Sequence, residues 1–343
     1  MRKTSTLIWL LGALFLIQSC AKDVLTNSSA ELEDFEFKVP AGFPDMEFEE
    51  ENPYSLDKWK LGKALFYENA FSIDGKKSCA SCHKQTLGFA DNVAFSPGAN
   101  EAAGTRNAPT LTNVGYQPYF MKEGGVRTLE LQALVPIQEH NEFNNNILTI
   151  SDSLKKIPFY NELSLKAYNR PFDYYVLTRA LGIFERTLVS GNSPYDQWAY
   201  QGMSEALNAK ELEGKDLFFG KANCSQCHSD FNFSNYAFEN NGLYENYADS
   251  GRYRLTRAPE DWGKFKVPTL RNIEVTAPYM HDGSLASLDQ VLEHYNSGGA
   301  NNPLKSSLIK PLGLTPQELD ALEAFLHTLT DKEFLNNRHF EQD

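Results

Sequence analysis

The chain has 343 residues, of which 41% are hydrophobic and 13% aromatic, and its formal net charge is −13. A chain of this length and composition can bury a substantial core, so disorder is excluded and two domains are expected. The acidic balance argues against nucleic acid as a partner, because its phosphates would be repelled, and favours partners with a basic face.

The first 52 residues predict export rather than a folded domain. Residues 1–20 have a basic start and an apolar run, Leu7–Ile17, that is too short to span a bilayer comfortably. Cys20 stands where bacterial lipoprotein signals place the lipidated cysteine, although an ordinary signal with an incidental cysteine is the alternative. The polar residues 21–52 are predicted to be a tether. We therefore expect a periplasmic or cell-envelope protein that touches a membrane only through a lipid anchor.

Three later segments have clear helical patterns. Residues 55–66 begin with a serine cap, residues 175–188 place apolar side chains on one stripe, and residues 315–329 open with a capping box and a proline. No sustained strand alternation is visible. The sequence therefore predicts an all-α fold with a closing helix near residues 315–329.

Two short segments carry the same Cys-x-x-Cys-His motif, which is the signature of covalent haem c attachment. The residues are Cys79, Cys82 and His83 in the first motif and Cys224, Cys227 and His228 in the second. Two thiols one helical turn apart both reach the vinyl groups on one porphyrin edge, while the adjacent histidine places its imidazole beneath the iron. With Cys20 assigned to the anchor, no cysteine remains for a disulfide. We predict two haem c groups with His83 and His228 as proximal ligands.

Two other interpretations of the cysteine pairs explain fewer residues. A thioredoxin-type pair needs no following histidine. A structural zinc site would gather all four cysteines from both halves of the chain and would leave both histidines as coincidences.

Internal similarity indicates a duplication. "LGKALF" (61–66) precedes the first haem motif and "EGKDLF" (213–218) precedes the second. Residues 108–130 match residues 267–289 at a constant offset of 159. The recurring residues are Pro109, Thr110, Leu111, Asn113, Met121, Gly124 and Leu129, which return as Pro268, Thr269, Leu270, Asn272, Met280, Gly283 and Leu288. The chain is therefore predicted to contain two cytochrome c-like haem domains related by internal duplication.

The boundary between these domains is expected within residues 190–210, which are rich in turn-forming residues. We assign residues 53–200 to an N-terminal haem domain and residues 201–343 to a C-terminal one.

Over residues 53–330 the chain resembles the bacterial di-haem cytochrome c peroxidases and the related enzyme MauG. The resemblance rests on an ordered set of motifs: "LGKALF", "SCASCH", "GTRNAPTL", "LELQALVPIQEHNEF", "CSQCH", "GKFKVPTLRN" and "TAPYMHDGSLASLDQVLEHY". It implies an N-terminal haem that meets hydrogen peroxide and a C-terminal haem that relays electrons.

The resemblance also indicates which iron has an open face. An iron with two strong axial ligands transfers electrons, whereas a free sixth position lets peroxide bind. Many family members cap the first iron with a histidine sixteen residues past the proximal one. Here Ala99 stands at that position, and no His or Met occurs between Lys84 and Gln117. The first haem is therefore predicted to be open without prior activation.

Peroxide cleavage needs a group that moves a proton between the two oxygens. In the family this acid lies ten residues beyond a glutamine, and Gln132 and Glu142 have that spacing. The resemblance thus makes Glu142 the acid/base and Gln132 its polar companion. Without it, two solvated residues on a helix and a loop would be an equally good interpretation. His140 is expected to be a surface or supporting residue rather than a ligand.

The second iron has two candidate sixth ligands. Tyr295 lies fourteen residues after His281, where family peroxidases supply Met and MauG-like proteins supply Tyr. A hard phenolate stabilises high oxidation states and implies a low potential, whereas a thioether favours ferrous iron. Met280 is the rival, but its repeat partner Met121 suggests a shared packing role. Tyr295 is preferred.

The region between the haems departs from the family pattern. Family members place a tryptophan ten residues before the glutamine, and here Lys122 stands there, which cannot carry an electron. Either a tyrosine or one of the tryptophans Trp59, Trp198 and Trp262 substitutes, or the haems exchange electrons directly. In the repeat alignment Lys122 corresponds to His281, and we expect both to face the domain interface.

The family also binds calcium between the domains through an asparagine side chain and two backbone carbonyls. Asn107, Thr276 and Pro278 occupy the matching positions, and hard oxygen ligands suit calcium. The alternative for these segments is simply tight turns.

Two classes of function follow. The first is an exported peroxidase that takes electrons from a small cytochrome or other donor protein, with a MauG-like oxidase of a protein substrate as a variant. The second is a plain di-haem electron carrier, against which the alanine at position 99 argues. A homodimer is compatible with either class.

Overall fold

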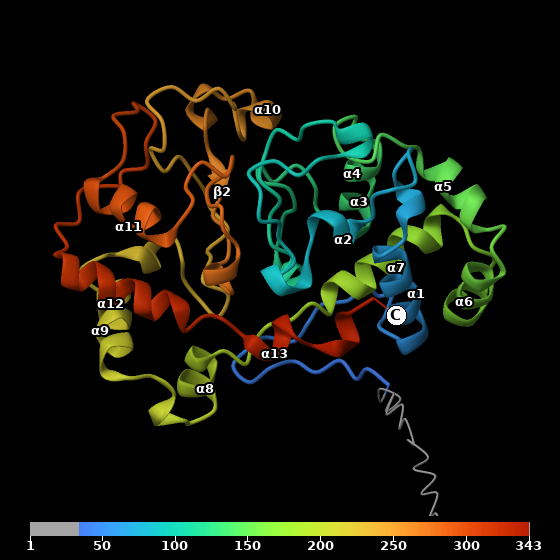
Figure 1. The fold of residues 1–343 in the computed structure, drawn as a ribbon, viewed down its shortest axis with the longest axis horizontal. Coiled ribbons are helices and arrows are strands. Elements are labelled where there is room, and N and C mark those ends of the chain that lie inside the picture. The colour runs from blue at the N-terminus through green and yellow to red at the C-terminus, as the bar shows by residue number, and fades with distance from the viewer. Residues whose placement is uncertain (1–33, 343) are drawn as a thin grey trace, which may run out of the picture. The chain divides into compact units, whose positions relative to one another are not determined.

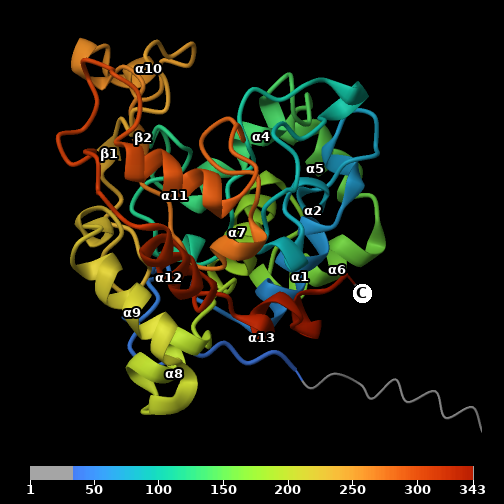
Figure 2. The same cartoon turned by 60° about the vertical axis from the view of Figure 1, so that its left-hand side comes forward.

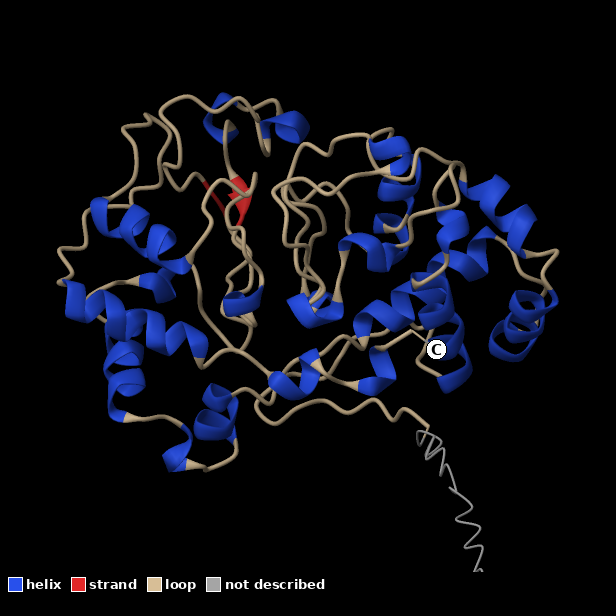
Figure 3. Ribbon diagram, viewed as in Figure 1, coloured by secondary structure: helices blue, strands red, loops and turns tan. Residues whose placement is uncertain are grey.

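The computed structural model describes residues 34–342, which are mainly helical, with long loops between the helices (Figures 1 and 3). The predicted signal, Cys20 and the first part of the tether lie outside the described residues. In chain order the α-helices are α1 (Leu56–Phe66), α2 (Cys79–Cys82), α3 (Leu129–Gln132), α4 (Leu134–Gln138), α5 (Ile147–Leu154), α6 (Pro158–Tyr168), α7 (Tyr174–Arg186), α8 (Pro194–Tyr200), α9 (Ala209–Phe219), α10 (Tyr253–Thr256), α11 (Leu288–Ser297), α12 (Pro316–His327) and α13 (Lys332–Leu335).

Strand structure is slight, as an all-α prediction requires. Within residues 34–342, strands β1 (Phe238–Glu239) and β2 (Phe265–Lys266) pair antiparallel, with Phe238 opposite Lys266. No helix in this part of the chain combines the length and apolarity needed to cross a membrane.

The three helices predicted from sequence are present. Ser55 caps α1 by accepting from the Lys58 amide, and Thr315 forms the predicted capping box with Glu318 at the start of α12. The predicted helix over 175–188 is α7, which begins after the cap Asp173 and ends at Arg186.

Two hydrophobic cores form around two similar helix crossings. α1 packs against α7 in the first core, and α9 packs against α12 in the second (Figures 1 and 2). A Cβ atom at Gly62 would lie 2.0 Å from the Ala180 carbonyl oxygen, and one at Gly214 would lie 1.9 Å from that of Ala321. The glycine of each "GK-x-LF" motif therefore allows the two helices of its half to touch.

Both ends of the described chain pack on the first core. Phe334, Leu335 and Phe340 are buried there although they belong to the sequence-assigned C-terminal domain. Phe35 stacks on Trp59 with ring centroids 4.4 Å apart, and Phe43 lies 4.7 Å from Phe231 of the second half. Residues 34–52 are thus not a free tether, because their spaced aromatic side chains find apolar partners on the globular part.

A buried polar joint connects the halves. Asn113 and Asn272 both have left-handed backbone conformations, with φ of 55° and 58°. The Asn113 amide donates to the Leu188 carbonyl at 2.8 Å, and the Asn272 amide donates to the Leu329 carbonyl at 3.0 Å. The Asn113 side chain also donates to Asn232, at 3.0 Å. These bonds satisfy buried polar groups and lock the loop after each haem motif against the end of the following long helix.

Candidate functional site

The first Cys-x-x-Cys-His motif is held by a short capped helix. Ser78 caps α2, and its amide donates to the Ser81 hydroxyl at 3.0 Å. The His83 Nδ1 atom lies 2.9 Å from the Phe89 carbonyl oxygen. The tautomer that donates this bond leaves Nε2 unprotonated and available to an iron.

The second motif repeats this geometry on a short 3₁₀ turn. The His228 Nδ1 atom lies 3.0 Å from the Phe233 carbonyl oxygen. Burial lowers the pKa of His83 and lowers the pKa of His228 to about 4, so both imidazoles stay neutral. All four cysteines of the two motifs are free thiols. Two free thiols beside an oriented neutral imidazole are the donor set that haem c requires, and the residues fit that group.

Glu142 lies near the first cysteine pair. Its carboxylate interacts electrostatically with both Cys79 and Cys82. Although the residue is exposed, surrounding protein atoms crowd the carboxyl group and, with a smaller contribution from the Glu139 charge, raise the pKa of Glu142 to about 7.

The loop that carries Ala99 is docked on the Glu142 segment. The Ala99 amide donates to the Glu142 carbonyl at 2.6 Å, and Ala99 is 2% exposed. A Cβ atom at Gly98 would lie 2.1 Å from the Asn141 carbonyl oxygen, so the backbones approach too closely for any other residue there. The loop is therefore held tightly against the Glu142 segment and carries alanine at position 99.

Gln132 is the last residue of α3 and lies ten residues before Glu142. Its backbone N–H donates to the Thr128 carbonyl at 3.0 Å. The intervening α4 places the two residues on one continuous segment. His140 is exposed, and its Nδ1 atom lies 3.2 Å from the Asn144 side-chain oxygen. This position agrees with a surface role.

Tyr295 and Met280 meet at one asparagine beside the second motif. The Asn241 side chain donates to the Met280 sulfur at 3.3 Å and is also hydrogen-bonded to Tyr295. Tyr295 is on α11, and its hydroxyl interacts electrostatically with both Cys224 and Cys227. Burial raises the pKa of the Tyr295 phenol, so a phenolate there needs a cation to stabilise it.

Met280 has a role in its turn that does not depend on a metal. Met280 and Met121 both have positive φ, at 75° and 66°, in turns closed by equivalent backbone pairs. Because the same conformation recurs in the first half, the geometry favours packing as the role of Met280.

Lys122 and His281 lie where the two halves meet. The Lys122 carbonyl accepts from the Lys266 amide at 2.7 Å, and the His281 carbonyl accepts from the Asn107 amide at 3.0 Å. Burial, with repulsion from Arg106, lowers the pKa of Lys122 to about 8. The His281 ring stacks on Phe265 at 4.2 Å.

An ion network reinforces this contact. Arg106 of the first half binds Asp249 of the second through two bonds of 2.6 and 2.9 Å and also pairs with Glu123. The sequence offered no sign of this pairing, because nothing in the spacing links residues 106 and 249. Asn241 was also missed, since a lone asparagine in a loop has no signature.

Asn107, Thr276 and Pro278 gather at the same contact. The side-chain nitrogen of Asn107 donates to the Val93 carbonyl at 3.0 Å. The side-chain oxygen, Oδ1, is thereby left for another partner. A Cβ atom at Gly283 would lie 3.1 Å from Pro278, and one at Gly88 would lie 3.4 Å from Thr276. Among the described residues no group of three His, Cys, Asp or Glu side chains is arranged for a metal, so a cation here would depend on amide and carbonyl oxygens.

The tryptophans are dispersed. Trp59 is in the first core and donates to Thr187 at 2.9 Å, Trp198 lies under Lys215, and Trp262 is 38% exposed.

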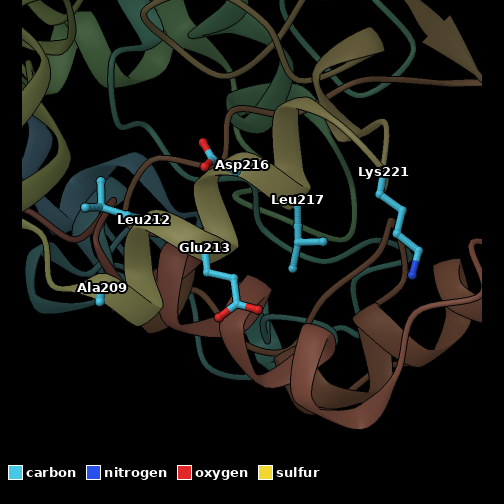
Figure 4. A pocket seen from close by; sticks show the side chains of 6 residues that line it. All are labelled: Ala209, Leu212, Glu213, Asp216, Leu217 and Lys221. Atoms are coloured by element: carbon cyan, nitrogen blue, oxygen red, sulfur yellow. The ribbon is translucent and has the colours of Figure 1, made fainter.

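A shallow hollow of about 530 Å³ lies along α9 (Figure 4). Its walls are Ala209, Leu212, Glu213, Asp216, Leu217 and Lys221, none of which is a predicted site residue.

Comparison with known proteins settles the family. Residues 56–205 match the sequence model of di-haem cytochrome c peroxidase, and residues 212–330 match that of cytochrome c. The chain is 34% identical over 326 residues to the methylamine utilization protein MauG of Methylorubrum extorquens, covering 93% of this chain and 91% of the relative. The chain belongs to the di-haem cytochrome c peroxidase and MauG family.

Other members of this family are also similar to the chain. The cytochrome c551 peroxidase of Nitrosomonas europaea is 34% identical over 283 residues, with 81% of each chain covered. The crystal structure of a MauG-like protein associated with microbial copper homeostasis superposes with a TM-score of 0.85 at 32% identity, covering 90% of this chain and 99% of that one. Membership of the di-haem family, with two fitting attachment motifs, implies two haem c groups in this chain.

Proposed function

We propose that the chain is an exported di-haem peroxidase that reduces hydrogen peroxide to water with electrons from a small redox protein such as a cytochrome c. The observation that carries this proposal is a difference between the surroundings of the first haem motif and those of the second. At the first motif, a carboxylate with a near-neutral pKa stands beside the cysteine pair, and the loop docked on the Glu142 segment carries alanine at position 99. When bound, the haems supply the iron that accepts peroxide and the stored electrons that reduce it.

The chain's own residues then move the protons. Glu142 takes the proton from one oxygen of the peroxide and gives it to the other oxygen, which leaves as water. A pKa near 7 suits both directions of transfer at neutral pH. Gln132 positions the peroxide by hydrogen bonding. Overall, one peroxide, two electrons and two protons give two water molecules.

The second half is proposed to relay electrons, with Tyr295 as the distal ligand and Met280 as the alternative. The contact of Tyr295 with Asn241 and its proximity to the second cysteine pair support this assignment. An anionic oxygen ligand lowers the reduction potential, so the second site releases electrons readily to the first.

Tyrosine at this position also supports a second candidate, a MauG-like oxidase that draws its electrons from a protein substrate. Relatives with that name are as similar to the chain as the cytochrome peroxidases are. Turnover separates the two candidates: a peroxidase consumes peroxide with a reduced cytochrome as sole donor, whereas the oxidase does so only with its substrate protein.

Four further features complete the proposal. Residues 53–200 and 201–343 are the two haem domains, and the matched helix crossings and matched asparagine joints support their origin by duplication. Asn107, Thr276 and Pro278 bind calcium at their contact. Residues 1–20, with Cys20 lipidated, direct the chain to the cell envelope. A homodimer is compatible with the arrangement.

Electron paramagnetic resonance of the oxidised holoprotein tests the difference between the two haem sites directly. One high-spin and one low-spin ferric signal are expected, because the first iron lacks a strong sixth ligand and the second has one. Two fully low-spin signals would favour the plain electron carrier and remove the peroxidase assignment.

A further inference from the structure

A basic and aromatic surface surrounds α10 in this acidic chain. Residues 252–264 contain four basic residues and two acidic ones, whereas the whole chain has 45 acidic and 32 basic residues. Seven residues of this region are exposed, among them Glu260. Four of the seven, which are basic or apolar, are together called the α10 surface: Arg254, Leu255, Arg257 and Trp262. The Arg254 side chain is 57% exposed, Leu255 is 48% exposed and Trp262 is 38% exposed.

The acidic neighbours of this surface have other partners. Asp261 pairs with Lys264 at 3.1 Å, and Glu123 pairs closely with Arg106 and only loosely with Arg254, at 3.8 Å. Arg257 lies over the Tyr253 ring, 5.8 Å from its centroid. The positive charge of the α10 surface is therefore only partly cancelled, although the exposed Glu260 lies nearby.

The α10 surface adjoins the contact between the two halves. A Cβ atom at Gly125 would lie 3.4 Å from both methyl groups of Leu255, so Leu255 covers a turn of the first half. Exposed apolar side chains rimmed by arginines are typical of protein docking surfaces.

A continuous route leads from this surface to the second haem site. The Trp262 indole donates to the Tyr247 carbonyl at 3.2 Å, and its ring lies 5.0 Å from Tyr253. Tyr247 is 6% exposed, and its hydroxyl donates to the Asn241 side-chain oxygen at 2.9 Å. Asn241 is in turn hydrogen-bonded to Tyr295. An exposed tryptophan is thereby connected, through one buried tyrosine and one asparagine, to the proposed distal ligand.

We propose that the α10 surface is the docking site for an electron-donor protein whose redox-active edge is ringed by carboxylates, and that Trp262 and Tyr247 carry its electrons to the second haem site. This identification of the partner rests on the proposed function. Each docked donor is oxidised by one electron, and two such electrons with two protons convert one peroxide to two waters. At physiological ionic strength the screening length is about 8 Å, so a docking partner senses this local surface more than the net charge.

Binding tests the surface without requiring turnover. Isothermal titration calorimetry of the holoprotein at low salt compares a small acidic cytochrome c with a basic one. The double variant Arg254→Glu/Arg257→Glu is expected to raise the Kd of the acidic cytochrome by about tenfold or more and to abolish its salt dependence. The matched control Lys155→Glu/Lys156→Glu, two exposed lysines after α5, is expected to leave that Kd unchanged. An unchanged Kd in the arginine variant, or tighter binding of the basic cytochrome to the wild type, would overturn the docking surface.

Trp262→Leu tests the route separately, because it keeps every charge. Calorimetry gives the Kd of the variant, and stopped-flow oxidation is then measured at concentrations that saturate the complex. The bound acidic cytochrome is expected to lose most of its fast phase. An unaltered fast phase removes Trp262 from the route. Wild-type protein that binds the acidic cytochrome through its arginines but consumes no peroxide would contradict the proposed function and leave the docking surface standing.

Discussion

The segment that follows the shared methionine turn takes different courses in the two halves of the molecule. Thr128 caps α3 and Ser287 caps α11, each by accepting an amide three residues on, and the two caps are separated by the repeat offset of 159. α11 then runs without a break, whereas the first half is divided into α3 and α4. At the same offset, Tyr295 corresponds to Pro136.

This single position accounts for much of the difference between the two sites. Pro136 has no N–H to donate to the carbonyl of Gln132, where α3 ends, and its ring has no atom that ligates a metal. Beyond it the chain turns and brings Glu142 beside the first cysteine pair. In the second half the uninterrupted helix presents Tyr295 instead. One framework thus supplies a proton-transfer group in one half and a candidate ligand in the other.

Removing the proton-transfer group should abolish the function of the first half alone. Glu142→Gln keeps the size of the side chain but cannot shuttle a proton, so kcat/KM for peroxide is expected to fall by about 10²–10⁴-fold. Stopped-flow peroxide turnover with a reduced cytochrome measures this loss. Asp152→Asn, an exposed carboxylate on α5, is the control and should retain the wild-type rate. A Glu142→Gln variant with full activity would remove Glu142 from the mechanism.

Changing the candidate ligand should alter the second half alone. Tyr295→Met replaces a hard oxygen with a soft thioether and is expected to raise the potential of the second haem by hundreds of millivolts, within the roughly 0.8 V that axial ligands span. Spectroelectrochemical titration measures both potentials, and that of the first haem should stay constant. Met280→Leu is the matched comparison and should change neither. The opposite result, with Met280→Leu shifting the potential and Tyr295→Met leaving it constant, would make Met280 the ligand.

The helix crossings should respond alike in both halves, because they share one geometry. Gly62→Ala and Gly214→Ala each force a methyl group to within about 2 Å of a carbonyl oxygen, so each is expected to lower the free energy of unfolding by about 3 kcal/mol. Denaturant unfolding followed by circular dichroism measures the loss. Gly75→Ala, where no atom lies within 4 Å, isolates the cost of a left-handed backbone at about 1 kcal/mol. A large loss in one half only would contradict the equivalence of the crossings.

Local signals explain which features could be predicted from the sequence. The haem motifs and the capping box at Thr315 depend on residues within a few positions of one another, and the structure has the predicted helix after Thr315. Arg106 and Asp249 are separated by 143 residues, so only the folded chain brings them together. The sequence predicts a tether over residues 21–52 because the aromatic side chains there are isolated among polar and acidic residues, whereas residues 34–52 pack on the folded part. Phe35 and Phe43 find their partners, Trp59 and Phe231, beyond the segment, whereas Phe37 packs on the nearby Phe48 and Tyr54.

The smallest expected effect concerns the charge that surrounds Glu142. Because Glu139 contributes to the raised pKa of Glu142, Glu139→Gln should move that pKa down from about 7, by less than about one unit since burial remains. Glu142 accepts the peroxide proton only as a carboxylate, so kcat/KM should rise with pH through this pKa and the rising limb should lie at lower pH in the variant. A pH profile of peroxide turnover measures the shift, and Glu139→Asp, which keeps the charge, should retain the wild-type limb. If the limb moves to higher pH, or is still present in Glu142→Gln, the titrating group is another residue. The second half offers no carboxylate at the equivalent register, so this pH dependence should belong to the first site alone.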